Sequence, residues 1–292
     1  MKRILVLILS VLFVYYAGAV YAGTLMVGAK GWYTYHDSFM NDHLTDRTEQ
    51  AILTSSPALS VSSSSESGNG TLLGGILGYQ TDNQAWAFSF AFMVFSKFSN
   101  SVETNGTGGG LPVVDVSYDI DEERRDYDFA ITYSLTDYMK VFAGGKYMSL
   151  KYSIDQFVDF NQAASPPLPP LPADYGEEIV IEATYILPTL GIGFSYPLNP
   201  HFIVGLQVGL LYVTGDYSTK YESGDSESGD FDPSYGYNVE AGITLVFGQK
   251  VLLQSSLRRQ SFKLKSSNDE GDIDGQDTNT GLTFALIYLI SI

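Results

Sequence analysis

Residues 85–94 alternate between large apolar and small side chains, and this period-two pattern recurs along most of the chain. The bulky phase of this segment consists of Trp86, Phe88, Phe90, Phe92 and Val94. Successive side chains of a β-strand point to opposite faces, so such a strand has one apolar face. Residues 202–212 and 235–247 repeat the pattern. A chain with this many alternating segments is predicted to be all-β, with each apolar face against a core or a lipid phase.

The start of the chain predicts export from the cytoplasm. A basic start precedes an apolar run, and small residues then place Val20 and Ala22 at the −3 and −1 positions of a cleavage site. The run is too short for a comfortable transmembrane helix, and the sequence contains no second one. We expect residues 1–22 to be a signal peptide and residues 23–292 to form one β-barrel domain.

Composition narrows the choice of function. The 292-residue chain contains no cysteine and has a net charge of −17, or −19 once Lys2 and Arg3 leave with the signal, which contains no acid. An exported chain without disulfides needs a closed or well-buried sheet. The acidic balance argues against nucleic-acid binding, which requires a basic surface. An exported, alternating chain with 21 tyrosines is typical of a transmembrane β-barrel, whose interfaces favour Tyr.

The connections between the alternating segments predict a topology. Short turns alternate with long polar connections at residues 37–70, 99–121, 154–177, 220–233 and 265–278. Short periplasmic turns and long extracellular loops are the asymmetry expected of a bacterial transmembrane barrel. We predict a transmembrane antiparallel up-and-down β-barrel of ten strands, with twelve or eight strands as the alternatives. The ten predicted strands are residues 24–36, 71–80, 84–98, 122–135, 139–153, 178–196, 201–219, 234–247, 251–264 and 279–292, and the fourth is expected to extend upstream through residues 113–118.

The two longest strands predict two further details. Residues 178–196 and 201–219 exceed the roughly 9–11 residues that cross a bilayer, so their surplus should form an extracellular extension of the barrel. Within residues 178–196 the apolar side chains change from one set of alternate positions to the other near Pro188. Because proline cannot donate a hydrogen bond to a neighbouring strand, we expect a β-bulge there.

The last strand adds a pattern of its own. A polar Asn279 is followed by Gly281 and then by spaced hydrophobic residues that end at Ile292. With the signal, the strands and the turns, this pattern resembles the small-to-medium outer-membrane β-barrel proteins of Gram-negative bacteria, which usually finish in Phe or Trp. The resemblance implies location in the bacterial outer membrane. It also implies outer-membrane lipids, lipopolysaccharide and the insertion machinery that reads the C-terminal strand as partners.

A ten-stranded barrel with a tall extracellular wall also looks like the omptins, outer-membrane proteases with a His–Asp pair and a second pair of acids at the barrel top. The chain has three histidines. His201 falls at a periplasmic turn, and His36 lies at the top of the first strand without an Asp two residues before it. No catalytic residue is transferred from that family, and we expect the protein not to be an enzyme.

Charged and amide side chains on the inward phase of the strands predict a polar network inside the barrel. Charges in a barrel interior must pair or meet water. A barrel of this strand number is narrow enough for side chains to fill it. The predicted members are Lys30, Arg124, Asp126, Asp128, Lys146, Glu182, Gln207, Glu240, Gln254 and Arg258.

Two acidic connections, residues 222–232 and 268–277, are dense in carboxylates and glycine. The second is similar to a calcium loop, although it lacks the full ligand spacing and the distal Glu. The alternative to a solvated loop is a weak divalent-cation site that bridges to lipopolysaccharide phosphates; no other cofactor is expected. The candidate ligands are Asp269, Asp272, Asp274 and Asp277.

These features together predict an integral outer-membrane barrel with a largely filled lumen. Its expected role is structural, adhesive or interactive at the cell surface, with the extracellular partner left open. The second hypothesis is a narrow porin-like channel for small solutes or ions, and the width of the lumen distinguishes it from the first. The third is an omptin-like protease or a lipid-acting enzyme, which would need a histidine in contact with an acid or a serine.

Overall fold

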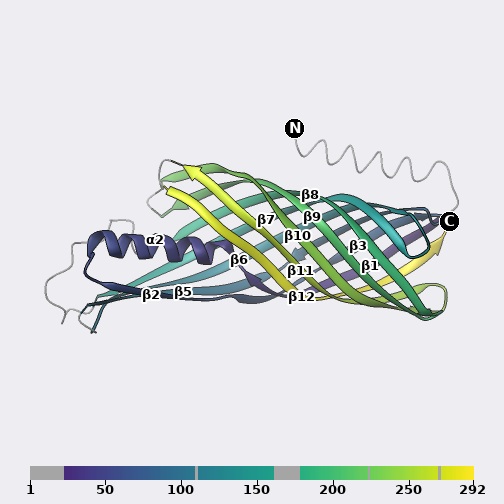
Figure 1. Cartoon of the computed structure of the whole chain (residues 1–292), viewed down its shortest axis with the longest axis horizontal. Coiled ribbons are helices and arrows are strands. Elements are labelled where there is room, and N and C mark those ends of the chain that lie inside the picture. Colours follow the sequence, from purple (N-terminus) through teal and green to yellow (C-terminus); the bar gives the residue numbers. More distant parts are fainter. Residues whose placement is uncertain (1–22, 109–110, 161–177, 223, 269–270) are drawn as a thin grey trace.

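The computed structural model describes residues 23–108, 111–160, 178–222, 224–268 and 271–292 (Figure 1). The expected signal peptide lies outside the described residues. The elements, in chain order, are β1 (Gly23–Asp37), α2 (Phe39–Ser55), β2 (Ser60–Glu66), β3 (Gly68–Thr81), β4 (Trp86–Phe95), β5 (Lys97–Gly108), β6 (Leu111–Ser134), β7 (Met139–Phe160), β8 (Ile179–Asn199), β9 (Phe202–Tyr221), β10 (Ser226–Phe247), β11 (Val251–Asn268) and β12 (Gly271–Ser291).

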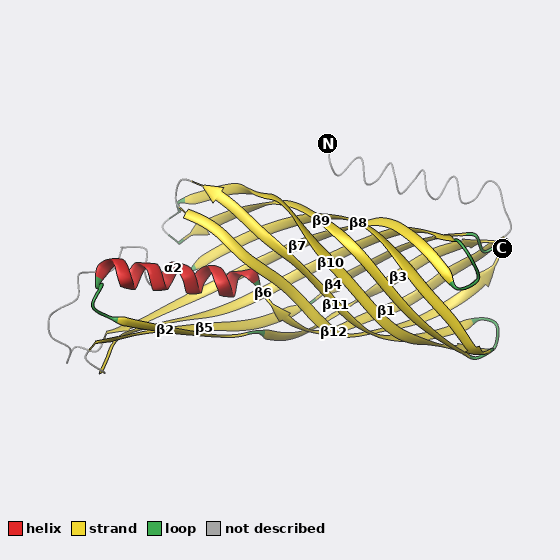
Figure 2. Ribbon diagram, in the orientation of Figure 1, coloured by secondary structure: helices red, strands yellow, loops and turns green. Residues whose placement is uncertain are grey.

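Ten strands close into an antiparallel barrel (Figure 2). The hydrogen-bonded ring runs β1, β12, β11, β10, β9, β8, β7, β6, β4 and β3, and β3 returns to β1. The remaining two strands, β2 and β5, pair with each other and continue β3 and β4 upward, each after a single intervening residue. The prediction of a ten-stranded up-and-down barrel is therefore confirmed.

Where the structure describes them, the long connections that the sequence predicted as loops are largely regular structure, so those loop boundaries are wrong. Residues 161–177 of the predicted connection 154–177 lie outside the described residues. Residues 39–55 form a helix, and residues 97–108 form β5. The predicted upstream extension of the fourth strand through residues 113–118 is confirmed, since β6 begins at Leu111. β5 buries Phe98, Val102 and Thr104 while its alternate residues face water. A strand whose outer face is polar because it lies outside the membrane has the composition of a loop, which is why its alternation was overlooked.

β8 contains no bulge at Pro188, contrary to the prediction. Its pairing with β7 passes through Gly145 and Pro188 without a register shift. Tyr185 is buried inside the barrel, whereas Leu190 on the opposite phase is 66% exposed on the outside. The apolar phase changes because the surroundings change: one stretch of β8 faces an apolar interior, and the next faces an apolar exterior.

Exposed aromatic and aliphatic side chains surround the half of the barrel that ends at the short turns. Trp86, Leu206, Phe284 and Leu286 are each at least 42% exposed on this surface. We call this surface the apolar belt, and we place its upper rim at the exposed tyrosines Tyr35, Tyr127, Tyr147, Tyr212 and Tyr235. Tyr is favoured at a membrane–water interface, and a band of this kind is the lipid-facing surface of a transmembrane barrel.

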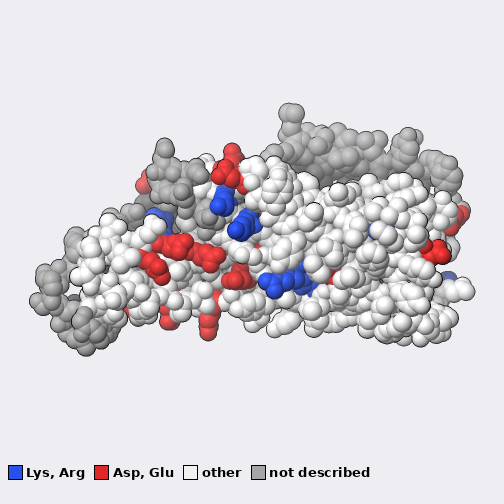
Figure 3. Space-filling model, in the orientation of Figure 1, with Lys and Arg blue, Asp and Glu red and all other residues white. Residues whose placement is uncertain are grey.

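Beyond the rim, toward α2, the barrel continues as a taller wall that we call the extracellular extension. Charged side chains gather over this half of the molecule, while the face of the belt in view is largely uncharged (Figure 3). The predicted surplus length of β8 and β9 is confirmed, since these strands have 21 and 20 residues, and its extracellular location stays a prediction. Lipid-facing segments need only about 9–11 residues per strand.

The interior of the extracellular extension is an apolar core with α2 packed against it. Phe39 contacts the rings of Tyr152, Tyr185 and Phe231 at centroid distances of 5.9, 6.5 and 5.9 Å. The buried face of α2 carries Met40 and Leu44 one turn apart, and its N-cap Ser38 accepts a hydrogen bond from the backbone N–H of Met40. Among the described residues, no helix is long and apolar enough to cross a membrane.

Candidate functional site

The lumen is crossed near the upper rim of the apolar belt by a layer of buried charged side chains around Trp32. Trp32 lies on the inward phase of β1 and is fully buried. The guanidinium carbon of Arg258 lies 4.9 Å from the centroid of the Trp32 ring. The guanidinium carbon of Arg124 and the ammonium nitrogen of Lys146 each lie 5.6 Å from the same centroid. The ring therefore contacts three cations, an arrangement that is stabilising when the cations are desolvated.

Asp126 joins two of these cations. It follows Arg124 by two positions on β6, so both side chains point into the barrel. Arg124 donates from Nε to Oδ1 at 2.8 Å and from Nη2 to Oδ2 at 2.9 Å, while Lys146 Nζ donates to Oδ2 at 2.8 Å. Arg124 Nη1 also donates to Oδ1 of Asn279 at 2.6 Å. This forked geometry satisfies both carboxylate oxygens and holds the guanidinium in one orientation.

Immediately above this group, a histidine lies between two carboxylates. His36 Nδ1 lies 2.8 Å from Oε2 of Glu122, and its Nε2 lies 3.0 Å from Oδ2 of Asp277. All three side chains are fully buried. His36 follows Tyr35, which marks the upper rim of the apolar belt, so His36 lies beyond the belt. Burial lowers the pKa of His36, but the two carboxylates outweigh it and raise the pKa to about 10. The imidazole is therefore a cation at neutral pH.

Below Trp32 the charged layer continues toward the periplasmic turns. Asp128 lies 3.3 Å from Lys146 Nζ and 4.0 Å from Arg258 Nη1, and Arg258 Nε donates to Oδ1 of Asn238 at 3.0 Å. Glu240 accepts a hydrogen bond from Ser256. A cavity of about 220 Å³ lies against this lower side, and its lining includes Lys30, Lys140, Gln207, Glu240 and Arg258.

The charges of this layer balance. With His36 protonated, four cations face four carboxylates. The members are His36, Arg124, Lys146 and Arg258 on one side and Glu122, Asp126, Asp128 and Asp277 on the other. We call these eight residues and Trp32 the plug. A set of charges removed from water has to be paired in this way to be tolerated.

Most of the predicted lumen network is in place. Arg124, Asp126, Asp128, Lys146 and Arg258 belong to the plug, while Lys30, Gln207 and Glu240 line the cavity beneath it. Gln254 lies on β11 in the same phase as Arg258. Glu182 was placed wrongly. It faces outward, 53% exposed, and lies 3.8 Å from Lys220. The predicted bulge at Pro188 would have reversed the inward and outward positions of β8 on one side of the proline. Because β8 has no bulge there, Glu182 points outward instead of inward.

Sequence reasoning missed Trp32, His36, Glu122 and Asn279 as members of the interior. Trp32 and His36 share the phase of Lys30 on β1, and Glu122 shares the phase of Arg124 on β6. The same alternation that identified Lys30 and Arg124 would have found them. Asp277 was treated as part of a loop, and that assignment hid its inward direction on β12.

The calcium-loop hypothesis receives no support from Asp277, which is bound to His36 and accepts from Asn279 Nδ2 at 2.8 Å. Asp269 lies outside the described residues, as do the side chains of Asp272 and Asp274, although the backbone of these last two belongs to β12. Over the part of the chain that the structure describes, no group of three or more His, Cys, Asp or Glu residues could hold a metal ion.

Comparison with known proteins shows the fold. No protein-family model and no curated protein sequence matches the chain. Among solved structures, the outer membrane protease OmpT from Escherichia coli superposes with a TM-score of 0.55 at 11% identity, over 94% of this chain and 100% of that one. The chain folds as an outer-membrane β-barrel.

Two other barrels are similar over most of the chain at lower TM-scores. The attachment invasion locus protein Ail of Yersinia pestis gives a TM-score of 0.31 at 10% identity, over 93% of this chain and 100% of that one. The toluene transporter TbuX of Ralstonia pickettii gives 0.35 at 10% identity, over 94% and 91%. The likeness to solved structures shows the fold alone, and a fold does not assign a function.

Proposed function

We propose that this protein is a non-conducting barrel of the bacterial outer membrane that acts through its extracellular extension. The observation that carries the proposal is the plug, a charge-balanced layer across the lumen in which Trp32, His36 and Asp126 have no exposed surface. An ion moving along the barrel axis would have to break a paired set of buried charges, which costs several kcal/mol per stranded charge.

A second barrier lies directly above the plug. The interior of the extracellular extension is filled by Phe39, Tyr152, Tyr185, Phe231 and Phe262, each at most 4% exposed. An apolar core of this density has no room for a hydrated ion. The cavity beneath the plug has Lys146, Arg258 and Gln260 in its lining, so it adjoins the plug on the side of the short turns.

The lipid-facing surface supports the proposed location. The outward phase of β12 carries Leu282, Phe284, Leu286, Tyr288 and Ile290, all at least 38% exposed. This continuous apolar face fits contact with outer-membrane lipids, and the same strand is the segment that the insertion machinery would bind. Lipopolysaccharide would then surround the extracellular extension, whose outer wall is charged.

The protease hypothesis is favoured by one observation, the contact of His36 with Asp277. The same geometry argues against it. A general base has to be unprotonated and within reach of the substrate, whereas His36 is fully buried and its pKa is raised to about 10. We infer that His36 is a structural cation of the plug, and we expect no hydrolysis of fluorogenic peptides at neutral pH.

A swelling assay with proteoliposomes tests the proposed function. Vesicles that contain the wild-type protein should swell in an isosmotic pentose solution no faster than protein-free vesicles. Vesicles with a general porin serve as the positive control, and circular dichroism verifies that the reconstituted wild-type protein is a folded barrel. Swelling of the wild-type vesicles at the rate of a general porin would overturn the proposal in favour of the channel.

A further inference from the structure

The wall of the extracellular extension has a seam. β2 pairs with β5, and the ring order places no strand on its other side within the described chain. On β12, pairing with β1 ends at Thr278, so residues 271–277 are paired with β11 alone. Within the described chain the two facing edges have no strand partner, and edges of this kind are templates for another strand.

α2 lies in this seam and covers the β12 edge. The backbone N–H of Gln276 donates to Oδ2 of Asp42 at 3.2 Å. A Cβ atom built on Gly275 would lie 3.1 Å from both Cβ and the carbonyl oxygen of Phe39, so the helix and this strand are in close contact. The first turn of α2 thus caps the β12 edge and prevents a further strand from pairing there.

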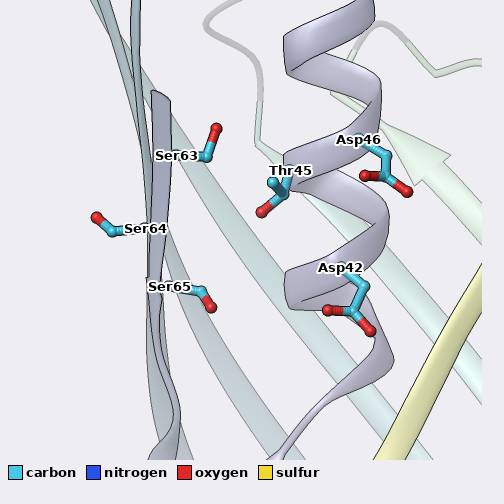
Figure 4. Close-up of a pocket in the computed structure, with 6 residues that line it drawn as sticks. All are labelled: Asp42, Thr45, Asp46, Ser63, Ser64 and Ser65. Carbon is cyan, nitrogen blue, oxygen red and sulfur yellow. The ribbon is translucent and has the colours of Figure 1, made fainter. Parts of the chain in front are cut away.

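The β2 edge, in contrast, lies beside an open groove. A cavity of about 270 Å³ separates this strand from α2, and its lining consists of Asp42, Thr45, Asp46, Ser63, Ser64 and Ser65. Figure 4 shows Ser63 and Ser65 directed toward the helix, while Ser64 points away from it. Asp42 and Asp46 lie one helical turn apart, so their carboxylates share one side of the helix.

We propose that the β2 edge binds an extended basic peptide, which adds a strand to the sheet and places Lys or Arg side chains against Asp42 and Asp46. Strand addition supplies affinity through main-chain hydrogen bonds and specificity through alternate side chains. The seven residues of β2 set the length of the partner segment. Because alternate residues of a strand share a face, a peptide with Lys at every second position directs its cations to the helix.

A basic partner is favoured over a second copy of this chain. The chain has a net charge of −17, and two β2 edges brought together would also bring two pairs of Asp42 and Asp46 together. The serine-rich strand provides few apolar contacts, so charge complementarity has to guide the association. This inference rests on the proposed function, since it assigns a partner class to the extracellular extension.

The experiment measures binding of a fluorescein-labelled peptide, Lys-Thr-Lys-Val-Lys-Thr-Lys, to the full chain in lipid nanodiscs by fluorescence anisotropy. Asp42→Asn/Asp46→Asn should weaken binding at least about tenfold, which corresponds to about 1.4 kcal/mol. The matched control Asp119→Asn/Asp155→Asn removes two carboxylates that are opposite each other on the outer wall of β6 and β7, and it should change binding less than about twofold.

Two N-methylated versions of the peptide separate strand addition from simple charge attraction. N-methyl groups at the odd positions block one edge of the added strand, and those at the even positions block the other. One version should lose binding and the other should retain it, because only one edge faces β2. Equal binding by both versions, or equal effects of the two Asp→Asn pairs, would overturn the proposal. A conducting barrel that still binds the peptide would refute the proposed function and leave strand addition intact.

Discussion

The imidazole Nε2 of His36 lies 3.0 Å from Oδ2 of Asp277, although 241 positions separate the two residues in the chain. They meet because β1 and β12 are the strands that close the barrel. In their register His36 is opposite Asn279, which places Asp277 one inward step further along β12. The contact therefore forms only when the barrel has closed, and it connects the first and last strands of the barrel through a buried ion pair.

Removing this carboxylate should be strongly destabilising. Asp277→Ala leaves a protonated His36 with one carboxylate in place of two, and Asn279 loses an acceptor. A broken buried pair costs about 3–5 kcal/mol. Reversible urea unfolding in lipid vesicles measures the loss. The control is Asp216→Ala, which removes an exposed carboxylate that accepts from Thr184 Oγ1 at 2.7 Å and should cost less than about 1 kcal/mol. Similar costs for the two variants would show that the plug is hydrated.

The pKa of His36 makes stability depend on pH. The pKa is raised in the folded state from its ordinary value of 6.5 to about 10, so this group stabilises the fold fully below pH 6.5. Between pH 6.5 and pH 10 the free energy of unfolding should fall by up to about 1.4 kcal/mol per pH unit. His36→Gln should flatten this decrease in unfolding titrations across that range. A wild-type profile that matches the variant would contradict a protonated His36.

His43 provides an internal check on the same titration. Burial, with a smaller effect of Arg47, lowers the pKa of this histidine to about 4. Its folded-state pKa lies below the ordinary value, so His43 disfavours the fold only as the pH falls below 6.5. His43→Gln should therefore leave the profile between pH 7 and pH 10 unchanged while it raises stability near pH 4. A changed alkaline profile would mean that His36 is not the group responsible.

Glu240 and Glu182 form a matched pair of tests, because the sequence placed both inside the barrel and the structure places only one there. Glu240 accepts hydrogen bonds from Ser256 and Thr283 inside the barrel. Glu240→Ala leaves both hydroxyls without this acceptor and should cost about 1–3 kcal/mol in reversible unfolding. Glu182→Ala should cost less than about 1 kcal/mol, as expected of an exposed pair. A reversed order of the two values would restore the original assignment of β8.

Phe90 tests the lipid-facing phase of β4. It is 37% exposed on the apolar belt, while its neighbour Ala91 is 5% exposed and faces the lumen. Phe90→Arg should cost about 2–4 kcal/mol if Phe90 lies at the bilayer midplane. Ala91→Ser adds one hydroxyl on the lumen side and should cost much less. Unfolding in vesicles of defined lipid composition provides both values, and a larger cost for Ala91→Ser would invert the assigned faces.

The alternation was sufficient to predict the barrel, its ten-stranded ring and the inward direction of Lys30, Arg124, Asp126 and Glu240. It failed where the surroundings of a strand change along its length, as in β8, where apolar side chains face inward in the extracellular extension and outward in the belt. It could not predict α2, because the helix is stabilised by packing against β12 and the apolar core more than by its own pattern.

The contacts of the plug were beyond sequence reasoning for a different reason. Arg124 and Asn279 are 155 positions apart, and the distance between their side chains depends on the stagger of all ten strands of the ring. The alternation along each strand identifies which residues point into the barrel. The shift in register between neighbouring strands decides which of these side chains contact one another. Only the closed structure shows that His36 and Asp277 belong to one layer.

The most direct test of the plugged lumen is the electrical conductance of the purified wild-type protein in a planar lipid bilayer. A general porin added in parallel verifies the assay by producing discrete current steps, and electrophoresis of the recovered membrane verifies that this protein has inserted. The plug predicts that the wild type, added at the same concentration and voltage, produces none. Steady open-channel currents from the wild type would contradict the account and identify the lumen as a conducting pore.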